Sequence, residues 1–168
     1  MFIGNREFLQ NCNDIADKYL EVAQKDEESA NILEKNGLFN QSGYFYIQAM
    51  EKYIKHHIAK KINITNEFYA NKLSRTIGHS LDESLNLLLE IYTSGKDEVI
   101  FSQMQKQLFE DIFHGVKFIS LHNKTRYPTY NSKHQNYTYL ELSERDCKEL
   151  CNMLTALKKY LNELWKIK

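Results

Sequence analysis

The segment from Gly43 to Ile58, with the sequence GYFYIQAMEKYIKHHI, constrains the fold more than any other part of the chain. As a helix, it places apolar side chains on two adjacent stripes, so its apolar face is unusually wide. The stripes consist of Ile47, Met50, Ile54 and Ile58, and of Tyr46, Ala49 and Tyr53. A helix with so wide an apolar face needs neighbours on several sides, and we expect it at the centre of a helical bundle.

In the rest of the chain the apolar residues also recur at helical spacing, and residues that interrupt helices are few. It contains six glycines and one proline, which favours a few long helices over many short strands. Apolar periodicity predicts helices over residues 5–36, 39–61, 66–73, 81–92 and 97–122, and a last one that begins at Ser143. The short turn at Asn36–Gly37 makes the first two an antiparallel hairpin. We therefore predict an all-α, up-and-down antiparallel bundle of about five helices, forming a single domain over residues 1–168.

Composition excludes several functional classes. The net charge is zero, which argues against a general nucleic-acid coat or an electrostatic membrane binder. No apolar run has membrane-spanning length, and the N-terminus lacks the pattern of a signal peptide. Three cysteines do not form a disulfide framework, which indicates a reducing compartment. We expect a cytoplasmic protein without membrane association and without a cofactor.

Three short motifs carry a resemblance to a known family. They are Gln-x-x-Glu-Lys-x-x-Lys at residues 48–55, Gly-His-x-Leu at residues 78–81 and Arg-Tyr-Pro at residues 126–128. In this order on these helices they resemble the HEPN family (higher eukaryote and prokaryote nucleotide-binding domain), over the range from Asp17 to about Leu161. The resemblance implies a compact helical domain that forms a homodimer and works beside a minimal nucleotidyltransferase.

A first hypothesis is a module that binds a nucleotide or an RNA phosphate. The candidate ligand-binding residues line one pocket in this hypothesis, with a tyrosine that stacks on a base. They are Lys52, Lys55, His79, Arg126 and Tyr127. In the structural alternative, Arg126 pairs with an acid such as Glu51, Tyr127 covers the core, and His79 only begins a helix.

A second hypothesis is a metal-independent endoribonuclease of the toxin type, as in toxin–antitoxin systems. Ribonucleases that the chain resembles carry an arginine, four to six residues, and a histidine; arginine would hold the phosphate and histidine would transfer protons. Here Arg75 and His79 have three residues between them, and Arg126 and His134 have seven. All four are candidate catalytic residues with atypical spacing. A third hypothesis is a dimeric interaction scaffold without catalysis, in which Arg126 is paired and buried.

Other polar clusters have simpler interpretations. Cys147 and Cys151 lie on the apolar stripe of the last helix and are expected to be buried thiols. His56 and His57 point to faces about 100° apart on a helix, so they do not form a chelating pair, and we predict no metal site. The basic end of helix 39–61 is explained by the helix dipole, with an anion site as the alternative. Residues 123–142 form a long irregular segment rich in tyrosine, as functional loops often are.

Overall fold

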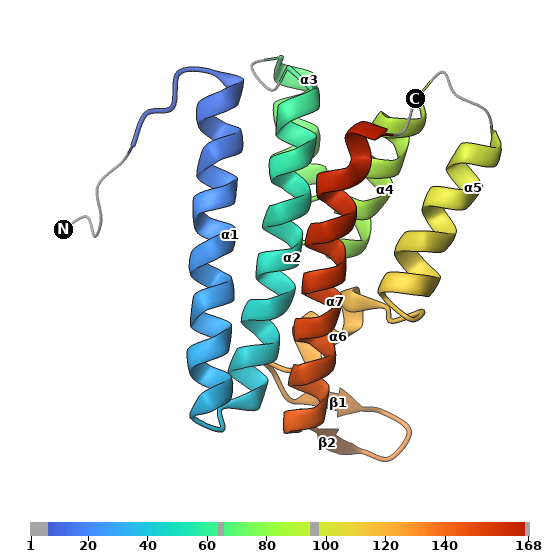
Figure 1. The fold of residues 1–168 in the computed structure, drawn as a ribbon. Coiled ribbons are helices and arrows are strands. Elements are labelled where there is room, and N and C mark those ends of the chain that lie inside the picture. Colours follow the sequence, from blue (N-terminus) through green and yellow to red (C-terminus); the bar gives the residue numbers. More distant parts are fainter. Residues whose placement is uncertain (1–6, 64–65, 95–97, 167–168) are drawn as a thin grey trace.

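The computed structural model describes residues 7–63, 66–94 and 98–166, and it confirms an all-α helical bundle (Figure 1). The α-helices are α1 (Cys12–Lys35), α2 (Phe39–Lys61), α3 (Glu67–Asn71), α4 (Leu81–Thr93), α5 (Glu98–Lys106), α6 (Phe118–Lys124) and α7 (Glu144–Glu163). Two π-helical segments, η1 (Lys72–Thr76) and η2 (Gln107–Ile112), extend α3 and α5, and a 3₁₀ turn, η3 (Leu164–Lys166), follows α7. The short strands β1 (Thr129–Asn131) and β2 (Asn136–Thr138) complete the list.

Helices α1 and α2 form the predicted antiparallel hairpin. Ala16, Ala23 and Ala30 of α1 are completely buried and recur every seven residues, so small side chains form the contact face. The backbones are close enough for side chains of α2 to reach carbonyls of α1. The Ser42 hydroxyl donates to the Ala30 carbonyl (2.9 Å), and Nδ1 of His56 lies 2.7 Å from the Ala16 carbonyl. The helix predicted over residues 5–36 begins later than expected, at Cys12, because the Asn11 side chain caps it by accepting from the Asp14 amide (3.0 Å).

Helix α2 occupies the centre of the bundle, as its wide apolar face predicts. It contacts α1, α4, α6 and α7, and the side chains of both predicted stripes are buried. Helix α4 runs in the same direction as α2. Leu81, at the start of α4, lines one pocket with Ile47 of α2, and Lys61, at the end of α2, lies over the ring of Tyr92, near the end of α4 (5.3 Å). The return path between them is supplied by α3 and η1.

Helix α7 also runs parallel to α2. Near its start the Cys147 thiol donates to the Phe39 carbonyl (3.2 Å), and further along Lys158 lies over the Tyr53 ring (5.1 Å). Figure 1 shows α1, α2 and α7 as neighbouring columns. Cys147 is buried, as expected from its place on the apolar stripe, and burial raises the pKa of its thiol, whereas Cys151 is only half-buried.

Predicted helix starts are confirmed at two serines. The Ser80 hydroxyl accepts a hydrogen bond from the Glu83 amide (3.2 Å), which caps α4. At α7 the Ser143 hydroxyl accepts from the Asp146 amide (3.3 Å), and the Asp146 carboxylate accepts from the Ser143 amide (2.8 Å). This reciprocal capping box fixes where the chain enters α7, directly after the strand hairpin.

The single helix predicted over residues 97–122 is wrong, because the chain breaks at His114 and Gly115. Both residues have positive φ, 49° and 73°, and the Gly115 amide bonds to the Phe109 carbonyl (2.8 Å), which ends the helix. Phe113 and Phe118 pack edge to face across the break (5.1 Å). Ile112, Val116 and Ile119 keep a helical spacing across the break, which made the segment resemble one helix.

Residues 123–142 are more ordered than an irregular loop, since β1 and β2 pair as an antiparallel hairpin with Tyr130 opposite Tyr137. Asn40, in the first turn of α2, fastens this segment to the bundle. Its amide donates to the Leu140 carbonyl (2.8 Å) and the Tyr139 hydroxyl (2.9 Å), and its carbonyl accepts from the Leu142 amide (2.6 Å). The hairpin lies at the end of the bundle where α7 begins (Figure 1).

No helix within the described ranges is long and apolar enough to cross a membrane.

Candidate functional site

The pocket around Arg126 is the site that fits the nucleotide hypothesis best. The Arg126 guanidinium carbon lies 4.9 Å from the ring centres of both Tyr44 and Tyr127, so two aromatic rings hold the cation. The pocket has a volume of about 290 Å³ and also includes Asn40 and Tyr139 in its lining. Its residues come from the first turns of α2, the end of α6 and the return from the hairpin.

Local structure explains why Arg126 faces solvent. Thr125, which follows α6, is buried, and its hydroxyl donates to the Leu121 carbonyl (3.0 Å). The Arg126 amide then bonds to the Asn123 carbonyl (3.1 Å) as the helix ends. Arg126 and Tyr127 are both exposed, and no carboxylate in the described part of the chain forms an ion pair with Arg126. The predicted structural pairing of Arg126 with Glu51 is therefore wrong.

Glu51 has a different partner. Its carboxylate accepts from the Lys55 ammonium (2.7 Å), and that ammonium also donates to the Gly78 carbonyl. The side chains of Glu51 and Lys55 are only 2% and 5% exposed, so the pair is buried between α2 and the segment before α4. The ring of His79 is 79% exposed, and its Nδ1 lies 3.7 Å from the same carboxylate. His79 borders a second pocket, of about 270 Å³, which Asn123 also lines.

Lys52 lies on another side of α2. Its ammonium donates to the Asp26 carboxylate of α1 (2.6 Å) and to the Gln48 side chain (3.0 Å). Adjacent helical residues point about 100° apart, so Lys52 turns toward α1 while Glu51 turns toward α4. The Gln48 amide lies 3.5 Å from Glu51, so the motif Gln-x-x-Glu-Lys-x-x-Lys forms one polar network within the bundle.

The five predicted ligand-binding residues thus do not share one pocket in the structure. Arg126 and Tyr127 line the first pocket, His79 lines the second, and Lys52 and Lys55 are engaged in ion pairs. The two pockets are neighbours on one face of α2. Their α2 residues, Tyr44 and Ile47, are three positions apart, which corresponds to about 4.5 Å along the helix axis.

The two Arg–His pairs predicted for ribonuclease chemistry are not assembled around a common pocket. Arg75 is an exposed residue of η1, and it does not line the pocket to which His79 belongs. His134 lies in the exposed turn between β1 and β2, where its amide bonds to the Asn131 side chain (3.3 Å). The pocket of Arg126 does not include His134.

The basic end of α2 forms a third pocket, of about 320 Å³, with His56, His57, Lys60 and Lys158 in its lining. Burial lowers the pKa of His57 to about 4, with further lowering by His56 and Lys60, and burial also lowers the pKa of His56. Both rings are therefore neutral near neutral pH. Lys158 is paired with Glu27 of α1 (2.8 Å), which leaves Lys60 to carry the positive charge of this pocket. The arrangement gives little support to the anion-site interpretation.

Sequence reasoning missed the other residues that line the pocket of Arg126, among them Asn40, Tyr44 and Tyr139. Tyr44 lies before the first motif and was visible only as an aromatic residue of the segment 43–58. Asn40 and Tyr139 come together through a hydrogen bond between residues 99 positions apart, which no local pattern reveals.

The described residues contain no group of three or more histidine, cysteine, aspartate or glutamate side chains that could hold a metal ion. Comparison of the chain with protein-family models, with curated proteins and with solved structures gave no match.

Proposed function

We propose that this chain is a HEPN-like module that binds the phosphate of a nucleotide or of RNA in the pocket of Arg126. The observation that carries the proposal is the exposed guanidinium of Arg126, which contacts the rings of Tyr44 and Tyr127 and has no carboxylate partner among the described residues. The resemblance of the three motifs to the HEPN family supports the same assignment.

The geometry suits a phosphate. Contact with two aromatic rings limits the rotation of the guanidinium, and its N–H donors lie along its edge. Two of these donors can bind a phosphate bidentately at low entropic cost, because the arginine is already held in place. The Tyr127 side chain is 56% exposed, which leaves ring surface for stacking on a nucleobase.

The interaction-scaffold hypothesis has less support. It requires Arg126 to be paired and buried, whereas this side chain is exposed and stacked on tyrosines. Our proposal also contains the two partners that the family resemblance implies, a second copy of the chain and a minimal nucleotidyltransferase. It places the protein in the cytoplasm. Exposed apolar residues of α3 and α5, Phe68 (65% exposed) and Phe101 (39% exposed), support association of copies. Light scattering of the purified protein measures whether a dimer forms.

One observation favours endoribonuclease activity as a second candidate function. The Glu51 carboxylate lies 3.7 Å from Nδ1 of His79, beyond hydrogen-bond distance but near enough that a small rotation of the exposed ring would bring the two into contact and leave Nε2 available for proton transfer. Asn123 joins the two pockets, since it lines that of His79 and its carbonyl accepts from the Arg126 amide. RNA bound by Arg126 at its phosphate would then place a neighbouring ribose toward His79.

Isothermal titration with uridine monophosphate tests the proposal. Arg126→Ala should abolish measurable binding, and Arg126→Lys should weaken it about tenfold or more, because lysine cannot form the bidentate, stacked contact. Arg75→Ala is the matched control, since Arg75 is an exposed arginine outside the pocket, and it should bind as the wild type does. Equal binding by wild type and Arg126→Ala would refute the assignment.

Cleavage of a single-stranded RNA without metal separates the two functions. If the chain is a ribonuclease, Arg126→Ala and His79→Ala should both lose cleavage, and His134→Ala should retain it because His134 lies in the hairpin turn. Nucleotide binding without any cleavage by the wild type would leave the binding module as the function.

A further inference from the structure

The hairpin beside the Arg126 pocket presents a second feature that the proposed function does not use. We define the tyrosine hairpin as residues 127–139, which contain Tyr127, Tyr130, Tyr137 and Tyr139. These four side chains are 47% to 72% exposed, an unusual concentration of aromatic surface on one short element. Tyr130 and Tyr137 are directly paired across β1 and β2, and their rings lie 5.2 Å apart on one face.

The charge of this region is one-sided. The chain as a whole has 22 acidic and 22 basic residues, yet residues 112–140 contain no aspartate or glutamate and four lysines or arginines. Within the hairpin region, Lys124, Arg126 and Lys133 form no ion pair with any described residue. A surface that combines uncompensated cations with exposed aromatic rings is complementary to single-stranded nucleic acid, whose phosphates are anionic and whose bases stack.

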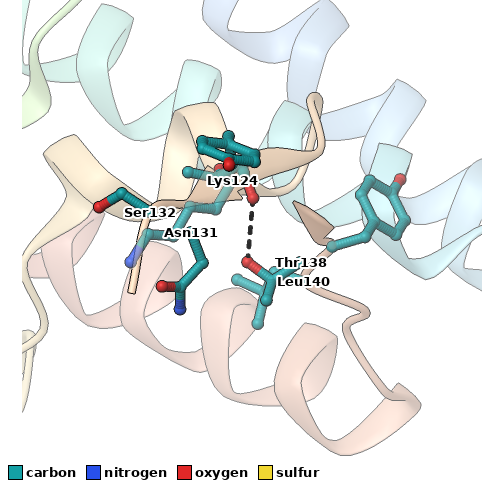
Figure 2. A pocket seen from close by; sticks show the side chains of 8 residues that line it. Lys124, Asn131, Ser132, Thr138 and Leu140 are labelled. Atoms are coloured by element: carbon teal, nitrogen blue, oxygen red, sulfur yellow. Dashed lines mark hydrogen bonds between the residues drawn. The ribbon is translucent and has the colours of Figure 1, made fainter. Parts of the chain in front are cut away.

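The hairpin and the Arg126 pocket are continuous. Tyr139 lines that pocket, and it also lines a pocket of about 480 Å³ on the hairpin itself. Figure 2 shows this hairpin pocket, with Asn131 and Ser132 on one side and Thr138 and Leu140 on the other. Tyr139 is fixed at the boundary, because its hydroxyl accepts from Asn40 (2.9 Å) and donates to the Thr125 carbonyl (3.3 Å).

We infer that the tyrosine hairpin is a platform for single-stranded RNA, which leads a strand from the Arg126 pocket across Tyr139 to the paired rings of Tyr130 and Tyr137. This inference rests on the proposed function and makes its ligand an RNA strand, not a free nucleotide. The amide and hydroxyl groups of the hairpin pocket, from Asn131, Ser132 and Thr138, are partners for ribose 2′-hydroxyls, which favours RNA over DNA.

The platform is attached firmly enough to hold a strand. Asn40 connects the return strand to α2 through the carbonyl of Leu140 and the amide of Leu142 (2.8 and 2.6 Å). Across the ladder, the Thr138 hydroxyl donates to the Thr129 carbonyl (3.3 Å). The exposed rings are therefore presented from a supported element, which reduces the entropy lost when bases stack on them.

The test compares a short ligand with a long one. Fluorescence anisotropy measures binding of a labelled uridine oligonucleotide of about twelve residues, a length within the range that single-stranded sites cover, and calorimetry measures uridine monophosphate. Tyr130→Ala and Tyr137→Ala should each lower the affinity for the oligonucleotide about tenfold and leave the affinity for the mononucleotide unchanged. Tyr137→Phe should bind as the wild type does, because the ring is retained. Phe8→Ala, which removes an exposed ring (85% exposed) from the segment before α1, is the matched control and should have no effect.

The outcomes separate the two proposals. If Arg126→Ala binds neither ligand, and the tyrosine variants lose binding of the oligonucleotide alone, the results support both the Arg126 pocket and the platform. Unchanged oligonucleotide binding in the tyrosine variants overturns the platform and leaves the Arg126 pocket. Weaker oligonucleotide binding in the tyrosine variants, with no effect of Arg126→Ala on either ligand, overturns the pocket and leaves the platform. Equal affinity for a thymidine oligodeoxynucleotide overturns the choice of RNA. Circular dichroism verifies that each variant is folded, as expected for exposed positions.

Discussion

The buried ion pair between Glu51 and Lys55 gives a sharp test of how this bundle is held together. Replacing Lys55 by methionine retains most of the apolar stem and removes the ammonium, with its hydrogen bonds to Glu51 (2.7 Å) and to the Gly78 carbonyl. The Glu51 carboxylate would remain 2% exposed, with Gln48 at 3.5 Å and His79 at 3.7 Å as its nearest alternative donors. Both distances are at or beyond the limit of a useful hydrogen bond.

An isolated buried carboxylate is costly, so we expect Lys55→Met to lower the free energy of unfolding by about 3–5 kcal/mol. The double variant Glu51→Met/Lys55→Met removes both charges and should be more stable than the single variant by about 2 kcal/mol or more. The matched control is Lys148→Met, which breaks an ion pair of the same i, i+4 spacing with Glu144, but with both side chains more than 60% exposed. This control should change stability by less than about 1 kcal/mol.

Urea unfolding followed by circular dichroism measures these differences, provided that the transitions remain two-state and the slopes agree. A cost below about 1 kcal/mol for Lys55→Met would refute the reasoning, because it would mean that the carboxylate finds water or another donor after the ammonium is removed. A double variant as unstable as the single one would refute it differently, by showing that the loss comes from packing and not from charge.

Two further predictions concern packing and pH. Gly43 lies in α2 where an added Cβ would overlap the Leu142 side chain, so Gly43→Ala should lower the free energy of unfolding in urea by about 1–2 kcal/mol despite the higher helix propensity of alanine. In a Leu142→Ala background the same substitution should be neutral or stabilising. An equal loss of stability in both backgrounds would contradict the contact. The pKa of His57 is about 4 in the folded protein, below its ordinary 6.5, so the unfolded chain takes up the proton first as the pH falls. The contribution of His57 to stability should be constant above pH 6.5 and fall by on the order of 1–2 kcal/mol between pH 6.5 and 4, after allowing for solvent screening. Below pH 4 this group should change stability no further. His57→Gln should flatten that part of the pH profile, and an unchanged profile would count against a depressed pKa.

The sequence predicted the bundle well where one helix face carries the information. The stripes of residues 43–58 placed α2 at the centre, apolar spacing predicted the start of α4, and Ser143 marked the start of α7. The break after η2 was missed because Ile112, Val116 and Ile119 keep a helical spacing across it, although Gly115 was a visible stop signal. Periodicity indicates which side chains face the core, and a tight turn that preserves the spacing leaves it nearly unchanged.

The candidate site was predicted only in part. Arg126 and Tyr127 were selected from their motif, and both line a pocket. Lys52 and Lys55 were selected for their charge, yet Asp26 and Glu51 neutralise them. Charge in a sequence does not reveal its partner, because ion pairs between helices depend on the rotation of one helix against another.

The sequence by itself determined the elements of this protein: helices with defined apolar faces, capped starts, and a tyrosine-rich segment whose residues 127–139 contain no aspartate or glutamate. Tertiary structure alone decided which cations remain available. It turned Lys52 toward α1, buried Lys55 against Glu51, and left Arg126 exposed between two rings. The physical reason is that periodicity is a local property of the chain, whereas the Asn40–Tyr139 contact and the stack of Arg126 on Tyr44 join residues some 80 to 100 positions apart through the packing of the whole bundle.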